Sequence, residues 1–409
     1  MVNMKYQKLI AFLVVLISVS SVLAWCKIPI GNVATWWFID TLILVFFYVL
    51  WDRKQFNIKI INIFLILVLC SAIYGLIIQA EIYWDYKLLY NNLMVFLLPL
   101  AAYAYMKPSL LTTTLKSYLA FSPWLLLLLV PFIDSDAFGR FLVPYSFMAL
   151  FFKELNGKNR ILVIGAFIFT LIFGSESRSD VLKFSLCVFF AICFYYKKIG
   201  NLLFKSIKFA RLIFLVIPFV FFILGASNTF NIFNIDEELG FEGKYSMSSG
   251  KDGDDVSALI DTRTFLFVEE ISSAIDNDYV VFGNSIARGY KSDFFGSIID
   301  TELKVNRGER QDCEVSILNI FNYFGLLGCI IYFLIFALAS YKAIYKSKNR
   351  YVPVIGLYIA FRWTFAWVED FSKFDLNYLF LWIMMGICFS PLYRNMTDED
   401  FKSWVKTIN

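Results

Sequence analysis

The sequence has 409 residues, of which 59% are apolar and 19% aromatic, and its formal net charge is +4. It contains no histidine, which removes the commonest general base and the commonest transition-metal ligand, and its seven cysteines are scattered without a CxxC pair. This composition excludes a zinc or redox centre, and we expect no metal ion and no cofactor. The apolar residues form long blocks separated by short charged segments, which predicts an all-α, polytopic membrane protein.

In chain order, the apolar blocks predict about twelve transmembrane helices. The first lies within residues 1–26 and is expected to remain uncleaved, because bulky Trp25 occupies a position where cleavage requires a small residue. Segments on one side of the predicted membrane hold 22 of the 37 lysines and arginines, against 6 in the short segments on the other side. Because basic residues concentrate on the cytoplasmic side, both termini are predicted to be cytoplasmic. The other predicted transmembrane helices are 36–51, 60–79, 88–106, 112–132, 138–152, 160–175, 181–196, 210–226, 313–340, 352–368 and 379–393.

This topology divides the chain into four parts. Residues 1–226 hold the first nine predicted transmembrane helices, 227–312 form a large periplasmic loop, 313–393 hold the last three helices, and 394–409 form a cytoplasmic tail. The loop contains 17 of the 33 acidic residues and 8 of the 37 basic ones, which is unlike a surface that binds nucleic acid.

Two amphipathic helices are predicted outside the transmembrane segments. The first covers residues 261–275 in the loop and is expected to pack against the membrane or the helical bundle. The second follows Thr397 in the tail and is expected to lie on the inner membrane surface as an anchor. The apolar faces are formed in the loop helix by Phe265, Val268, Ile271 and Ile275, and in the tail helix by Phe401, Trp404, Val405 and Ile408.

A polar turn between two predicted transmembrane helices carries the first candidate site residue, Arg178. The turn reads Gly-Ser-Glu-Ser-Arg-Ser-Asp over residues 174–180 and lies on the outer side of the membrane, where arginine is disfavoured. Its small serines would let a ligand approach the guanidinium closely. The alternative is an arginine that only anchors the helix at the membrane boundary.

Four further candidate arginines lie in the large loop. Guanidinium groups bind phosphate through two parallel hydrogen bonds and stay charged at any working pH, so these residues are candidate ligands for a phosphate-bearing substrate. Each is alternatively an ordinary solvated arginine. One begins the predicted loop helix and another lies in a glycine-flanked turn; the four are Arg263, Arg288, Arg307 and Arg310.

Three more ionisable residues are candidates near or within predicted transmembrane helices. Asp312 and Glu314 head the tenth helix, where they either act as a base facing a basic cavity or stabilise the positive end of the helix. Arg362 lies inside the eleventh helix, where an ionisable side chain indicates a site, although its i, i+7 spacing to Glu369 also permits a structural ion pair. The acidic run 252–255 lacks the full ligand spacing of a calcium loop and is interpreted as a solvated turn.

Several short motifs follow one another in a fixed order. They are Ser-Glu-Ser-Arg at 175–178, the loop helix that begins with an arginine, the glycine-flanked turn at 283–289, and Phe-Gly-Leu-Leu-Gly at 324–328. In this order and topology the chain resembles the O-antigen polymerases and O-antigen ligases of bacterial surface polysaccharide assembly. The resemblance covers about residues 160–340 with motifs and the rest only by hydropathy. It implies a fold of the membrane glycosyltransferase C type in a bacterial inner membrane.

The resemblance also implies roles for single residues. Arg178 and Arg263 match the family's pyrophosphate-binding arginines, whereas Arg288 and Arg310 are supported mainly by their chemistry. In the ligases an essential histidine lies eleven residues before the first glycine of the Gly-Leu-Leu-Gly turn, and this position is Glu314 here. The chain departs from the ligase pattern at the residue that activates the acceptor, and this departure favours a polymerase.

We therefore expect a polymerase of lipid-linked repeat units that serves lipopolysaccharide biosynthesis. It would transfer the growing glycan from undecaprenyl diphosphate to the non-reducing end of another lipid-linked repeat unit without a metal ion. The expected partners are these substrates and membrane lipid; a chain-length regulator is left open, and no nucleic acid is expected. Two alternatives remain: a ligase that moves the same donor to lipid A–core and, from another class, a flippase of lipid-linked sugars.

Overall fold

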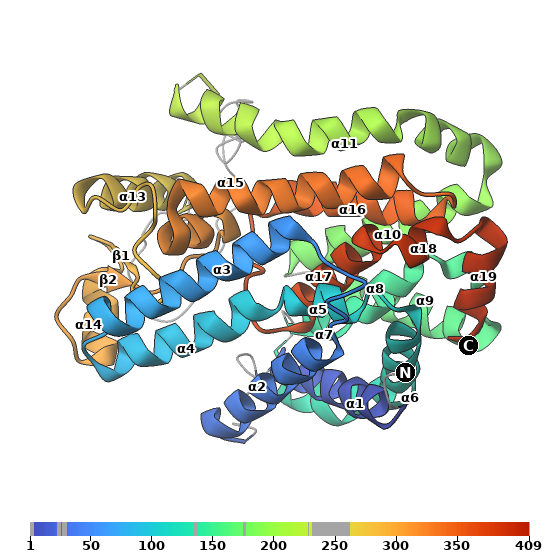
Figure 1. Cartoon of the computed structure of the whole chain (residues 1–409), viewed down its shortest axis with the longest axis horizontal. Helices are drawn as coiled ribbons and strands as arrows, with labels where there is room; N and C mark the ends of the chain where they lie inside the picture. The colour runs from blue at the N-terminus through green and yellow to red at the C-terminus, as the bar shows by residue number, and fades with distance from the viewer. Residues whose placement is uncertain are drawn as a thin grey trace.

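The computed structural model describes residues 4–22, 26, 31–134, 137–174, 177–227, 229–230 and 262–408. Within these residues the regular secondary structure is helical, apart from a two-stranded antiparallel ribbon and one isolated β-bridge (Figure 1). The all-α class predicted from the apolar blocks is confirmed. The acidic run 252–255 and two residues of the polar turn at 174–180, namely 175 and 176, lie outside the described residues.

The helices of the first half of the chain overlap the predicted apolar blocks, although the helix Lys197–Ala226 begins thirteen residues before the predicted 210–226. Two of them continue into other helical forms, as a π-helix at Gly75–Gln79 and a 3₁₀ turn at Val130–Phe132. The α-helices are α1 Met4–Ser20, α2 Val33–Leu50, α3 Lys59–Tyr74, α4 Tyr83–Leu97, α5 Leu100–Ala104, α6 Pro108–Leu129, α7 Phe138–Phe141, α8 Val143–Ala149, α9 Gly157–Phe173, α10 Arg178–Tyr195 and α11 Lys197–Ala226.

The second half contains the elements of the large loop, three long apolar helices and a short C-terminal pair. The ribbon joins Tyr290 to Arg310 and Lys291 to Glu309. The elements are α13 Thr262–Asp276, β1 Tyr290–Lys291, α14 Gly296–Leu303, β2 Glu309–Arg310, α15 Ser316–Tyr345, α16 Tyr351–Phe365, α17 Leu376–Phe389, α18 Pro391–Asn395 and α19 Asp398–Lys406.

Six helical stretches among the described residues are long and apolar enough to cross a membrane by length and composition. Their length and composition indicate a membrane-embedded helical protein. One predicted transmembrane helix, 138–152, is instead broken into α7, α8 and a 3₁₀ turn at Phe152–Glu154, because Pro144 has no backbone N–H and therefore starts a new helix. The six stretches are Val33–Leu50, Lys59–Gln79, Tyr83–Ala104, Pro108–Phe132, Lys198–Ala226 and Ser316–Tyr345.

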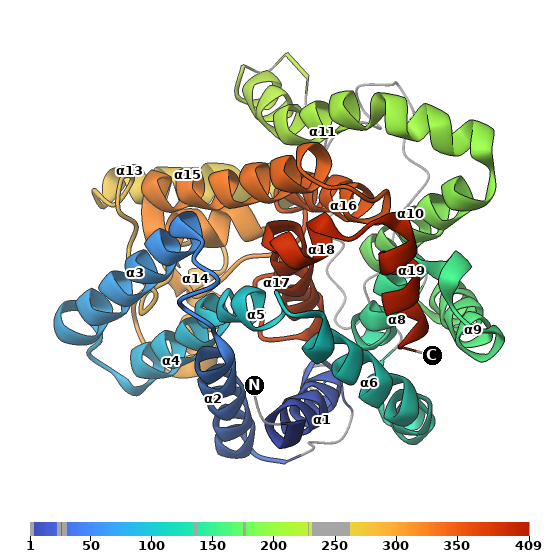
Figure 2. The ribbon, with the colours of Figure 1, turned by 45° about the vertical axis from the view of Figure 1, so that its right-hand side comes forward.

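Helix α17 forms the centre of the molecule. Every one of its residues is buried, which is expected only of a helix surrounded by protein on all sides. Figure 2 shows α5, α8, α15 and α16 around it. The elements of the large loop (α13, α14, β1 and β2) gather at one end of the molecule, and α19 lies at the opposite end (Figure 1). The bundle therefore carries one polar, irregular end that is built mainly from the loop.

The C-terminal helix α19 packs on the protein. Its apolar face is buried, with Phe401 0% and Trp404 8% exposed. The ring of Phe401 stacks on Tyr351 with centroids 4.5 Å apart, and Trp404 meets Tyr393 edge-on at 5.2 Å. The expectation of an anchor on the inner membrane surface is therefore wrong, because neighbouring helices supply the apolar partner that lipid was expected to supply.

Helix α15 is broken at Gly325, whose φ of 63° and ψ of −163° are accessible in practice only to glycine. The break frees backbone groups that the loop after α13 then satisfies. The Leu326 N–H donates to the carbonyl of Val280 (2.9 Å), and the Asn284 N–H donates to the carbonyl of Asn322 (2.6 Å). The break therefore ties the polar end to a long apolar helix.

Replacing Gly325 by alanine is expected to destabilise the protein by about 3 kcal/mol or more, because the backbone is strained for any side chain. A Cβ atom there would also lie 2.4 Å from the backbone of Val281. Gly165→Ala in α9 is the matched control, since a Cβ at that position meets nothing within 4 Å. Thermal unfolding of the two purified variants should separate them, and equal midpoints would contradict the role given to this glycine.

Candidate functional site

The residues that directly follow α16 contact several other segments of the chain. We call residues 366–371 the α16 end. The backbone N–H of Ser316, at the start of α15, donates to the carbonyl of Glu369 (3.2 Å). In return, the N–H of Phe371 donates to the Ser316 hydroxyl (2.8 Å). These bonds hold the segment 312–316, which carries both predicted carboxylates, against the α16 end.

Helix α10 reaches the α16 end through its first turn, which begins with Arg178. The Ser179 hydroxyl donates to Oε1 of Glu369 (2.9 Å). The Arg178 side chain is exposed, and within the part of the chain that the structure describes its guanidinium has no hydrogen bond or ion pair. A guanidinium whose backbone is anchored while its head stays open is suited to binding an anion.

Helix α13 brings a second arginine to the same place. Nε of Arg263 donates to the carbonyl of Val368 (2.9 Å), the residue next to Glu369. Arg178 and Arg263, which are far apart in the sequence, are therefore both positioned by adjacent residues of the α16 end.

Asp312 and Lys373 add charges of both signs at this end. Asp312 keeps an exposed surface, yet the surrounding protein atoms raise its pKa above the ordinary value, and the Asp370 carboxylate raises it further while Lys373 opposes both. Nζ of Lys373 lies 3.6 Å from Oδ2 of Asp370. A carboxylate with a raised pKa is a stronger base once it is ionised.

Glu314 is paired with Arg310. Nη2 of Arg310 donates to Oε1 of Glu314 (2.5 Å), and the Glu314 side chain is 64% exposed. The Arg310 guanidinium carbon lies 4.1 Å from the centre of the Phe295 ring, and its backbone belongs to β2. Arg310 is therefore held from two sides, and it orients a carboxylate that remains open to solvent.

Arg288 and Arg307 lie in a second charged cluster, where carboxylates already engage them. Arg288 forms an ion pair with Glu309 through both carboxylate oxygens. Nη1 of Arg307 donates to both oxygens of Asp85 (2.7 and 2.9 Å), and Nη2 donates to Glu81 (2.7 Å). The Arg307 pairs join the loop to the start of α4. An anion that binds either arginine would have to compete with these carboxylates.

Arg362 is enclosed in the bundle with 1% of its surface exposed. Nη1 donates to Oδ1 of Asn377 (2.9 Å), and its guanidinium carbon lies 4.5 Å from the centre of the Phe371 ring. Among the described residues, Nε and Nη2 have no hydrogen-bond partner. The ion pair with Glu369 that the spacing permitted does not form, because Glu369 faces α10 instead.

The loop helix α13 covers Thr262–Asp276, close to the predicted 261–275, and residues outside its predicted apolar face are buried in the protein. Val268 and Ile275, on its apolar face, are 61% and 60% exposed, whereas Leu266 and Glu270 on another face are 2% and 0% exposed. Cys313 Sγ donates to Oε2 of Glu270 (3.8 Å), and burial raises the pKa of Glu270 well above its ordinary value. Burial therefore favours the uncharged form of this carboxyl group at its core position.

Several charged residues that sequence reasoning did not select also belong to this end. Arg140 donates to Asp375 (3.1 Å), and Lys183 binds Glu369 (2.9 Å). The sequence did contain a pattern that could have selected these residues. Arg140, Lys183 and Lys373 lie on the predicted outer side, where basic residues are disfavoured, and that same signal selected Arg178.

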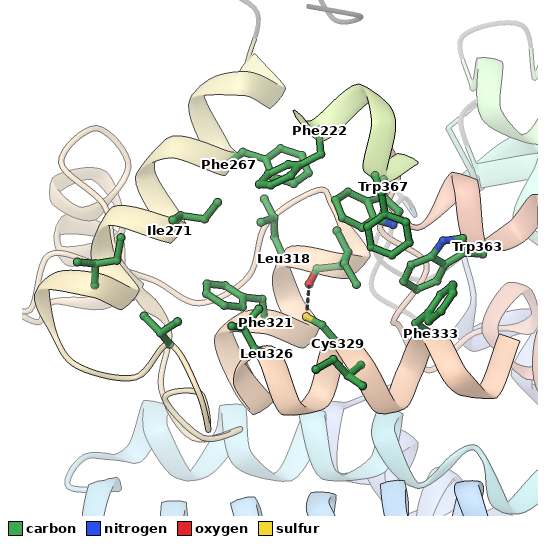
Figure 3. Close-up of a pocket in the computed structure, with 15 residues that line it drawn as sticks. Phe222, Phe267, Ile271, Leu318, Phe321, Leu326, Cys329, Phe333, Trp363 and Trp367 are labelled. Atoms are coloured by element: carbon green, nitrogen blue, oxygen red, sulfur yellow. Dashed lines mark hydrogen bonds between the residues drawn. The ribbon is translucent and has the colours of Figure 1, made fainter. Parts of the chain in front are cut away.

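Two apolar pockets, of about 420 and 530 Å³, lie beside the α16 end; both are lined by α11, α13 and residues of α16 or its end, and the smaller one also by α15. Figure 3 shows the smaller one, with Phe222 from α11, Phe267 from α13 and Phe321 from α15 facing a common space that Trp367 closes. The larger one shares Phe222, Phe267 and Trp367, and it extends to Val368. Pockets of this volume fit small ligands or segments of lipid chains.

Among the described residues, no group of three or more histidines, cysteines, aspartates or glutamates is arranged to hold a metal ion. Comparisons of the chain with models of protein families, with curated proteins and with solved structures found no match. The fold and the site thus indicate a membrane-embedded, all-helical class of protein in which, among the described residues, arginines and carboxylates gather around the α16 end.

Proposed function

We propose that this protein is a membrane glycosyltransferase of the O-antigen polymerase kind. It takes a glycan carried by undecaprenyl diphosphate and transfers it to the non-reducing end of a second lipid-linked repeat unit. We further propose about twelve transmembrane helices with a glycosyltransferase-C-like arrangement in a bacterial inner membrane. Both termini are then cytoplasmic, and the polar end is periplasmic.

One observation supports the proposal most: a single residue both lines an apolar pocket and binds an arginine guanidinium group. Val368 lines the larger apolar pocket, while its carbonyl accepts the hydrogen bond from Arg263. Arg178 begins its helix beside the next residue, Glu369. A ligand that fits both features needs a long apolar chain joined to a phosphate group, as in a polyprenyl diphosphate.

In the proposed reaction, a hydroxyl oxygen of the acceptor sugar attacks the anomeric carbon of the donor glycan. The bond from that carbon to the diphosphate oxygen breaks, and its electron pair leaves with undecaprenyl diphosphate, whose charge Arg178 and Arg263 stabilise. The hydroxyl proton passes to a carboxylate, Glu314 or Asp312. A single displacement of this kind inverts the anomeric carbon.

A deletion strain separates the proposed function from its rivals through the lipopolysaccharide ladder. Loss of a polymerase leaves core bearing a single repeat unit, because ligation and lipid flipping continue. Loss of a ligase or a flippase leaves core alone. Core with one repeat unit is the expected result, and core alone would contradict the polymerase.

Chelation of metals should not affect the reaction, because arginines supply the charge that a divalent cation supplies in many phosphate-dependent enzymes. We expect EDTA to leave the rate of chain extension by the purified protein unchanged. Strong inhibition that added Mg²⁺ or Mn²⁺ reverses would contradict the arginine-based mechanism and would direct attention to the acidic run 252–255.

A further inference from the structure

Arg178 stands between two serines whose hydroxyl groups are both engaged. The Ser177 hydroxyl donates to Oδ2 of Asp180 (3.1 Å), and the Ser179 hydroxyl donates to Oε1 of Glu369 (2.9 Å). These bonds restrain the chain on either side of Arg178 while its own side chain stays exposed. The serines of this turn thus serve to hold the backbone in place.

Lys183, one turn further along α10, joins the two carboxylates that accept from these serines. Its Nζ lies 2.6 Å from Oδ1 of Asp180 and 2.9 and 3.1 Å from the two carboxylate oxygens of Glu369. Lys183 and Asp180 are only 4% and 6% exposed. Gly139 of α7 closes the other side, since a Cβ atom there would lie 2.3 Å from Oδ2 of Asp180. The Lys183 ammonium group therefore contacts three oxygen atoms of two carboxylates, and the protein packs tightly around it.

Stability alone is a weak explanation for such an arrangement. Removing charged groups from water costs about as much free energy as their attraction returns, so apolar side chains of similar volume often stabilise a buried niche equally well. What the ion network does supply is position. It fixes the first turn of α10 to Glu369, and the neighbouring residue, Val368, accepts the hydrogen bond from Arg263.

We infer that Lys183 is a positioning residue that sets the separation of Arg178 and Arg263, so that both guanidinium groups reach one diphosphate. This inference rests on the proposed function, because it takes undecaprenyl diphosphate as the ligand. A diphosphate needs both arginines at the correct spacing, whereas a monophosphate can be bound by either one. Loss of Lys183 should therefore weaken the binding of the diphosphate lipid more than that of the monophosphate lipid.

The test measures the dissociation constants of undecaprenyl diphosphate and undecaprenyl monophosphate for the purified protein in lipid nanodiscs. Lys183→Met should weaken diphosphate binding about 10-fold and monophosphate binding about 2-fold or less. In an Arg178→Ala background it should have no further effect, because the spacing no longer matters. Lys107→Met, which removes a 3.0 Å ion pair with Asp52, is the matched control and should change neither affinity.

The double variant Ser177→Ala/Ser179→Ala decides the question if Lys183→Met does not fold, because it keeps every charge. It should weaken diphosphate binding about 3-fold or more and leave monophosphate binding unchanged. Folded variants that bind the diphosphate lipid as tightly as the unsubstituted protein would overturn the positioning role and leave the proposed function intact. An unsubstituted protein that binds undecaprenyl diphosphate no better than undecaprenol would overturn both.

Discussion

Alanine at either Arg178 or Arg263 is expected to abolish chain extension while the protein still inserts and folds. Each guanidinium is proposed to stabilise the charge that develops on the leaving diphosphate. Loss of one such charge-assisted contact should lower the rate on the order of 10²-fold or more. The lipopolysaccharide ladder at matched expression and the extension rate of the purified variant are the two measurements.

Two controls give this result its meaning. Lysine at either position should restore little activity, because an ammonium offers a point charge where two parallel hydrogen bonds are needed. Arg350→Ala, which removes an exposed arginine paired with Asp398 at 3.9 Å, should leave the ladder normal. A normal ladder from Arg178→Ala or Arg263→Ala would remove that arginine from the site.

The second large effect is expected at the base. Glu314→Gln should strongly lower the extension rate and leave donor binding near normal, because the carboxylate handles the acceptor proton and not the diphosphate. Its position supports this role, since Glu314 is exposed beside the α16 end and is oriented by Arg310 at 2.5 Å. Separate measurement of donor affinity and of turnover distinguishes this result from Arg178→Ala, which should weaken donor binding as well.

Asp312 is the competing candidate, and its raised pKa gives it a distinct signature. A carboxyl group with a raised pKa loses its proton at a higher pH. If Asp312 is the base, the acid limb of kcat/KM should therefore lie above the ordinary aspartate value of about 3.9 and disappear in Asp312→Asn. A native rate from Glu314→Gln together with an inactive Asp312→Asn would transfer the role to Asp312.

Much of the fold could be predicted because lipid imposes a simple pattern. Apolar blocks gave the helical class, and the periodicity of the loop gave the extent of α13 to within one residue at each end. The buried face of α13 could not be predicted, because its partners are a ribbon and a loop that lie later in the chain. The C-terminal helix itself was predicted but its partners were not, because its apolar face meets Tyr351 and Tyr393, which lie earlier in the chain.

Single residues of the candidate site could be proposed from the sequence, but which of them lie together and which are paired could not. Sequence reasoning selected five outer arginines, of which Arg288, Arg307 and Arg310 proved to be paired with carboxylates. Their partners, such as Asp85, are more than two hundred positions away in the case of Arg307. Long-range pairing of this kind leaves no local pattern in a single sequence. The contact of Lys183 with Glu369 escaped prediction for the same reason, because 186 positions separate the two residues.

The most direct measurement uses the purified protein in nanodiscs with a synthetic undecaprenyl-diphosphate repeat unit as the only substrate. A polymerase should convert it to lipid-linked glycans of two and more repeat units and release one undecaprenyl diphosphate for each new linkage. The new linkage should have the inverted anomeric configuration. A protein that is folded, binds the substrate and forms no dimer or longer glycan, but instead transfers the repeat unit to added lipid A–core, would contradict the polymerase and establish a ligase.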